Sequence, residues 1–142
     1  MSIAQNETVV LDKKTEQEID LFLEAFYESG KTQEAGQQMV NSQLKTSQVR
    51  GLENLITATT RFSEIVNYIK NQTGKKKTEW QTVGPLLLDQ LNDIEIKANE
   101  IRSISPALKM EIKLNLARGW ARQVVAHYFY KAPIKGGHVD DE

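Results

Sequence analysis

Arg50 and Arg61 lie in a stretch of the chain whose apolar residues recur every three or four positions. This spacing predicts one helix over residues 47–71. At about 100° of rotation per residue, both arginines then lie on the polar side of that helix, opposite its apolar stripe. A guanidinium group matches phosphate oxygens with two parallel hydrogen bonds, so this face could bind a phosphate backbone. A helix face that is simply solvated is the alternative interpretation.

The start of this predicted helix is marked by hydroxyl side chains. Thr46 or Ser47 can accept a hydrogen bond from a free backbone N–H of the first turn. Arg50-Gly51, and later Arg118-Gly119, each place a glycine beside an arginine within a predicted helix. Glycine costs a helix interior about 1 kcal/mol relative to alanine. We therefore expect another backbone, from a neighbouring helix or a nucleic acid strand, to approach closely at both positions.

Charge is distributed unevenly along the 142 residues. Residues 1–36 hold eight acids against three lysines, whereas residues 37–139 hold fifteen Lys and Arg against eight acids. The positive excess favours an anionic partner for the middle and C-terminal part, although an acidic first helix packed on basic ones is the alternative. The chain has no cysteine for a disulfide or thiolate metal site, no signal peptide pattern and no long apolar run. We expect a soluble, cytoplasmic protein.

The periodicity predicts an all-α, single-domain helical bundle of about four to five helices over residues 15–131. Residues 1–14 are expected to form a loose leader and residues 132–142 a flexible acidic tail. The predicted helices begin at Thr15, with a capping box to Glu18, within 31–43, near Ser47, at Gly84-Pro85 after a loop over 72–84, and at Ser105-Pro106.

The last predicted helix, which continues to about Lys131, carries two apolar arcs. One arc is an inner stripe that joins the bundle, and the other consists of Ile112, Leu116, Trp120 and Tyr130. A bundle helix needs one stripe, so the second arc predicts contact with another element or another chain. An interface with a partner or a second copy and additional packing within the chain are equally compatible with this pattern.

Catalytic groups are scarce in this sequence. The two histidines, His127 and His138, are separated, so neither a metal site nor a nucleophile–base pair is expected. Arg122 and His127 do have the Arg–four residues–His spacing of HEPN ribonucleases, which are also small helical proteins. Inside one continuous helix, however, these two side chains point about 140° apart. A HEPN-like ribonuclease is therefore an alternative and not the main hypothesis.

Two segments resemble a known family. Leu44–Leu55, with Thr-Ser-Gln-Val-Arg at its centre, resembles the Leu-Thr-Thr-Ser-(Lys/Gln)-(Leu/Ile)-Arg signature of the Csm-type small subunit of type III CRISPR effector complexes. Trp120–Tyr130 is similar to that family's C-terminal helix, where a run of aromatic residues precedes a short tail. The resemblance covers about residues 15–131. Arg122 stands where the family commonly has an acid, and the usual Ala-Gly-Arg ending of the third helix is replaced, so the subtype stays open.

The resemblance implies a non-catalytic small subunit of an RNA-guided antiviral complex, without cofactor or metal. Such subunits stack along a ribonucleoprotein filament and contact guide and target RNA mostly through the RNA backbone. The implied partners are these RNAs, other effector subunits and further copies of the chain, with no membrane. The residues expected to contact RNA are Lys45, Arg50, Arg61, Lys113, Arg118 and Arg122, with the lysine run 75–77 as a weaker candidate. A helical adaptor that binds only protein is the alternative from another class.

Overall fold

The computed structural model describes residues 10–75 and 78–131. Within these residues the chain forms six helices and no strand: α1 (Lys13–Glu28), α2 (Lys31–Asn41), α3 (Thr46–Ala58), α4 (Phe62–Gly74), α5 (Thr78–Glu100) and α6 (Pro106–Lys131). The predicted all-α class is confirmed, but there are more helices than the four to five expected. The predicted tail, 132–142, and most of the predicted leader, 1–14, lie outside the described residues. No described helix is long and apolar enough to cross a membrane.

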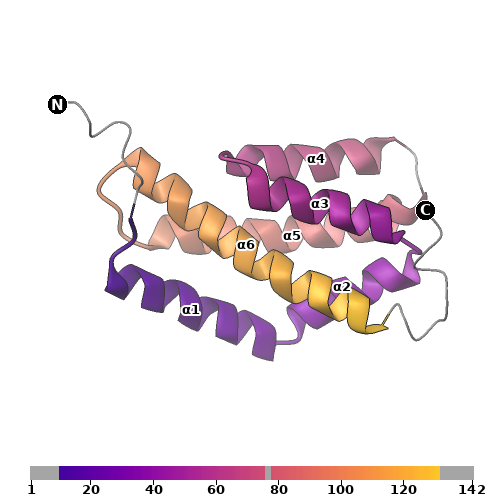
Figure 1. Ribbon diagram of the computed structural model, residues 1–142, viewed down its shortest axis with the longest axis horizontal. Coiled ribbons are helices and arrows are strands. Elements are labelled where there is room, and N and C mark those ends of the chain that lie inside the picture. The colour runs from indigo at the N-terminus through magenta and orange to yellow at the C-terminus, as the bar shows by residue number, and fades with distance from the viewer. Residues whose placement is uncertain (1–9, 76–77, 132–142) are drawn as a thin grey trace.

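Helix α6 is the central element of the bundle. It runs the length of the molecule between α1 and α3 and contacts all five other helices (Figure 1). A helix surrounded in this way must be apolar on several sides. Its buried residues accordingly occur at nearly every angle around its axis: Ile112, Leu114, Leu116, Ala117, Gly119, Trp120, Ala121, Val124, Val125 and Tyr128.

The second apolar arc predicted on the last helix is therefore mostly covered within the chain. Ile112 and Leu116 are fully buried, and Trp120 donates a hydrogen bond from its indole Nε1 to Gln90 Oε1 at 2.9 Å. Tyr130 is the one member of this arc that reaches solvent, with 70% of its surface exposed. Of the two explanations for the arc, packing within the chain is the correct one for three of its four residues.

The single helix predicted over 47–71 is in fact two helices, α3 and α4. The chain leaves the helical conformation at Thr59, whose ψ of 152° is extended, and re-enters it after Arg61, which is extended as well. The reason lies in the spacing of the apolar residues, because Ile56 and Phe62 are six positions apart and a straight helix cannot place both in one core stripe. The break restores both residues to the core, where each is almost completely buried.

The predicted helix start at Gly84-Pro85 is also wrong, because both residues lie inside α5. Trp80, Val83 and Leu87 continue one buried stripe through this point, and burying the stripe favours helix on both sides of the proline. Pro85 itself is exposed, so the carbonyl oxygen that it leaves without an N–H donor can be hydrated. The same stripe continues through Leu91, Ile94, Ala98 and Ile101, all of which are buried.

Other helix boundaries follow recognisable caps. Asp12, and not Thr15, caps α1, since its Oδ1 accepts a hydrogen bond from the Thr15 N–H at 2.8 Å. Gly30, with a φ of 85°, makes the left-handed turn between α1 and α2 that the sequence predicts. Ser105 caps α6 as expected, through a hydrogen bond from the Leu108 N–H. At α3 the predicted hydroxyl cap is replaced by Gln48, whose side chain accepts from the Lys45 N–H.

Glycines allow α6 to pack closely against α1 and α2. A methyl group at Gly36 would lie 2.5 Å from His127 Cβ and 2.8 Å from the Tyr128 backbone nitrogen, and one at Gly119 would overlap the Leu23 side chain. Close approach was expected at Gly119 and at Gly51. At Gly51 it is absent, because a methyl group there would meet Tyr68 Oη at 3.4 Å, an ordinary contact distance.

These distances predict opposite signs for two glycine substitutions. Gly51→Ala should raise the free energy of unfolding by up to about 1 kcal/mol, because alanine stabilises a helix interior and its methyl group fits. Gly36→Ala should lower it by about 1–3 kcal/mol, because the α6 backbone has to move away. Urea denaturation of both variants measures the two values. A shift of the same sign for both would contradict the described packing of α2 on α6.

Trp120 gives a second stability test. Trp120→Ala should lower the free energy of unfolding by about 3–5 kcal/mol, because it leaves a large cavity beside α5 and removes the donor for Gln90. Tyr130→Ala, an aromatic truncation on the same helix at an exposed position, should change it by less than about 0.5 kcal/mol. Thermal denaturation monitored by circular dichroism compares the two variants, and similar losses would show that Trp120 is not a core residue.

Candidate RNA-contacting surface

The two segments that carry the family resemblance meet in space. Tyr128, near the end of α6, donates a hydrogen bond from its hydroxyl to the Leu44 carbonyl oxygen at 2.7 Å, and both residues are buried. The Arg50 guanidinium lies 4.2 Å from the centroid of the ring of Phe129, the residue that follows Tyr128. This distance is typical of a cation–π contact. The start of α3 and the end of α6 therefore form one packed unit across 84 residues of sequence.

Arg50 is the best-positioned cation of this unit. Its guanidinium pairs with Glu53 Oε1 at 2.7 Å, yet 52% of its side chain is exposed. Exposed ion pairs one helical turn apart contribute only about 0.5 kcal/mol or less, so a phosphate can replace Glu53 at little cost. The Phe129 ring packs on the guanidinium, and about half of the Arg50 side chain remains open to solvent. Lys45, at the N-terminal end of α3, is exposed. The sequence did not single out Phe129 as part of the site.

Arg61 does not share a helix face with Arg50, because the helix break separates them. It is the residue before α4, its side chain is 71% exposed, and its only ion-pair partner among the described residues is Glu64 at 4.0 Å. Its backbone N–H donates to Thr59 Oγ1, which fixes the turn between α3 and α4. Arg61 is therefore an accessible cation in the turn between α3 and α4, whereas Arg50 lies in the second turn of α3.

Arg118 and Lys113 lie beside this turn but are largely occupied by the fold. Arg118 donates from Nη2 to the Thr59 carbonyl oxygen at 3.2 Å, which ties α6 to the end of α3. Lys113 pairs with Glu95 at 3.2 Å, and only 17% of its side chain is exposed. These two cations mainly stabilise the packing of α6. Their contribution to the positive potential of the surface is secondary.

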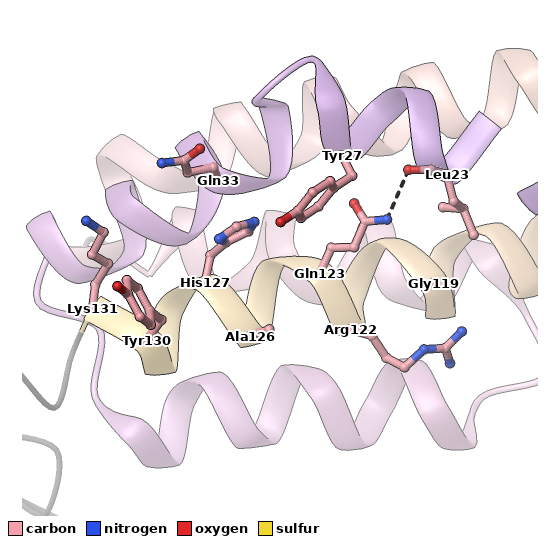
Figure 2. A pocket seen from close by; sticks show the side chains of 10 residues that line it. All are labelled: Leu23, Tyr27, Gln33, Gly119, Arg122, Gln123, Ala126, His127, Tyr130 and Lys131. Carbon is pink, nitrogen blue, oxygen red and sulfur yellow. Dashed lines mark hydrogen bonds between the residues drawn. The ribbon is translucent and has the colours of Figure 1, made fainter. Parts of the chain in front are cut away.

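Arg122 differs from the other candidates. It is exposed, it has no ion pair or hydrogen bond with any described residue, and it lines a groove of about 730 Å³ bounded by α1, α2 and α6. Figure 2 shows Arg122 and His127 leaving α6 in different directions, with His127 turned toward Tyr27. Within one chain the Arg and His of the HEPN-type spacing therefore do not converge on a common point.

No metal site or acid–base pair is assembled among residues 10–75 and 78–131. No group of three or more His, Asp and Glu side chains lies close enough to hold a metal ion there. His127 stacks on Tyr27 with ring centroids 5.6 Å apart and an angle of 17° between the rings. Burial lowers the pKa of His127 below its ordinary value of 6.5, and the nearby Lys131 lowers it further. The imidazole is thus neutral near pH 7.

The six predicted site residues are thus divided among three places. Lys45 and Arg50 lie at the start of α3, Arg61, Lys113 and Arg118 lie at the corner between α3 and α4, and Arg122 lies in the groove beside α1. The lysine run 75–77 is described only at Lys75, which is exposed at the end of α4. No protein-family model matches this chain, and no curated protein or solved structure matches it either.

The lowered pKa of His127 predicts how stability depends on pH. The unfolded chain takes up this proton at a higher pH than the folded protein, so stability is complete above about pH 6.5 and falls as the pH drops below it. His127→Gln should weaken this dependence, because glutamine does not titrate. Urea midpoints measured between about pH 5 and pH 7 test the difference. Identical pH dependence in both proteins would show that His127 does not contribute to it.

Proposed function

We propose that this protein is a non-catalytic small subunit of a type III CRISPR RNA-guided interference complex and acts in the cytoplasm. It stacks beside other subunits and contacts the backbone of guide or target RNA through Arg and Lys. The observation that carries the proposal is the packing of Arg50 on Phe129, together with the hydrogen bond from Tyr128 to Leu44. These contacts join the two segments whose motifs carry the resemblance, and they leave about half of the Arg50 side chain exposed.

The distribution of charge supports contact with RNA through its backbone. Arg50 and Arg61 are both exposed and lie eleven residues apart, one in the second turn of α3 and the other just before α4. Cations spread over a rigid surface suit a polyanion that extends across it. Recognition of this kind reads charge and shape and is largely independent of base sequence.

The absence of convergent catalytic groups in the described part of the chain fits a scaffold role. A general base must lie within hydrogen-bond reach of the proton that it removes, and a catalytic pair must converge on one reacting atom. His127 is instead stacked against Tyr27, and Arg122 points elsewhere. In the proposed complex, nuclease chemistry belongs to other subunits.

The function is tested by RNA affinity across a salt series. Full-length protein should bind a generic single-stranded RNA at low ionic strength, and the affinity should fall as salt rises. Arg50→Ala should weaken binding and reduce the slope of log affinity against log salt by about 0.7, the value expected for one phosphate contact on a single strand. Arg50→Lys should retain most of the slope, because it keeps the charge.

Arg102→Ala is the matched control, because Arg102 is an exposed arginine in the connection between α5 and α6, far along the chain from the proposed surface. It should leave both affinity and slope nearly unchanged. Salt-independent or undetectable RNA binding would favour an adaptor that binds only protein. Cleavage of the RNA by the purified protein, lost in His127→Ala, would favour the ribonuclease alternative.

A further inference from the structure

A groove of about 730 Å³ lies beside α6. Its floor is the exposed stripe of α6, and its wall comes from the end of α1 and the first turns of α2 (Figure 2). Gln123 fixes one edge by donating from Nε2 to the Leu23 carbonyl oxygen at 3.0 Å. Ala126 lies on the floor, and its small side chain leaves the space between its larger neighbours open. Among the described residues that line the groove there is no carboxylate.

Aromatic rings dominate the part of the groove around Ala126. Tyr27 is 51% exposed and stacks against His127 from α6, and Tyr130, also on α6, is 70% exposed. A folded protein usually covers such rings, because each can bury a large apolar area. Here the flat rings of two tyrosines remain open to solvent along one groove, as they do in sites where planar groups stack.

Cations stand at both ends of the same groove. Arg122 is at one end and Lys131 at the other, nine residues apart. This is about 14 Å along α6 and half a turn around its axis, so the two side chains leave the helix on opposite sides (Figure 2). Arg122 has no partner among the described residues, and the described contact of Lys131 is with the Tyr130 ring, 5.7 Å from its centroid. Two cations without a lining carboxylate create a positive potential, so the complementary ligand is an anion with a planar, apolar part.

We propose that this groove holds a short stretch of single-stranded RNA, with one base on the exposed aromatic rings and phosphates of the flanking backbone at Arg122 and Lys131. The inference rests on the proposed function, since it presumes an RNA partner. Single-strand sites combine stacking rings with cations that follow the backbone, and the groove offers both. A protein helix with an apolar face would instead bring these two cations next to apolar surface, which makes RNA the better match.

The test compares two short single-stranded RNAs that differ at one central position, where one carries uracil and the other an abasic sugar. Binding of each to full-length protein is measured by fluorescence anisotropy at low ionic strength. A stacked base is worth about 1–3 kcal/mol, so the RNA with the complete set of bases should bind about 5- to 150-fold more tightly. Tyr27→Ala should reduce this preference, because it removes one of the rings.

Ala126→Phe provides a sharper variant, because it fills the groove without removing any group that the fold uses. The position is exposed, so the variant should fold normally, and circular dichroism checks this. It should abolish the preference for the complete RNA. Ala107→Phe is the matched control at an exposed position in the first turn of α6, outside the groove, and it should keep the preference. Arg122→Glu should weaken binding of both RNAs, whereas Arg102→Glu should do so much less.

Each outcome separates the groove from the wider function. Loss of the base preference in Ala126→Phe but not in Ala107→Phe would support the proposal. RNA binding that is equally tight for both oligonucleotides and unaffected by groove variants would overturn it, and the proposed function would stand. No RNA binding at any salt concentration would overturn both. Altered self-association of Ala126→Phe in sedimentation velocity, with RNA binding unchanged, would assign the groove to a second copy and overturn the proposal.

Discussion

Helix α6 has to be apolar on nearly every side, because the five other helices all pack against it. A hydrogen-bonded chain at its centre fixes this arrangement. Trp120 donates to Gln90 of α5, and Gln90 in turn donates to the Lys31 carbonyl oxygen at the start of α2. Gln90 is 3% exposed, so its amide must be satisfied inside the protein, and three helices are held at one point. The positions of the remaining helices follow from the room that they find around α6.

The candidate surfaces lie where the other helices do not fully cover α6. At the start of α3, Tyr128 donates a hydrogen bond to the Leu44 carbonyl oxygen, and the neighbouring Phe129 ring packs against the Arg50 guanidinium. Beside α1, the turn at Gly30 redirects the chain into α2, and the outer stripe of α6 stays open over Ala126. Polar and aromatic side chains collect at these openings, because the rest of α6 is reserved for packing. Some residues of α6 therefore form the core, and the others form the candidate surfaces.

The sequence predicted the class of the fold and most of its core, because apolar residues that recur every three or four positions lie on one buried face of a helix. Leu87, Leu91 and Ile94, for example, follow four- and three-residue spacing, and all three are buried. The break between α3 and α4 was missed, although the six-residue interval between Ile56 and Phe62 does not fit a single helical stripe. The helix through Pro85 was missed for the opposite reason: a local signal was given more weight than the stripe that continues past it.

For the candidate site, the sequence could supply cations but not their neighbours. Nothing local to Lys113 shows that Glu95 pairs with it. The same holds for Phe129 and Tyr27, whose roles depend on partners more than seventy residues away in the chain. Tertiary contacts decide which charges stay accessible, and no periodicity within one helix contains that information.

The central position of α6 also has a consequence for biosynthesis. This helix leaves the ribosome after the other five, and until it does they lack the surface around which they pack. Contacts such as those of α4 with α5 can form early, but α1 and α3 make their most extensive contacts with a helix encoded far downstream. The nascent chain therefore exposes part of its apolar surface until translation has passed Lys131, and exposed apolar surface of this kind favours aggregation.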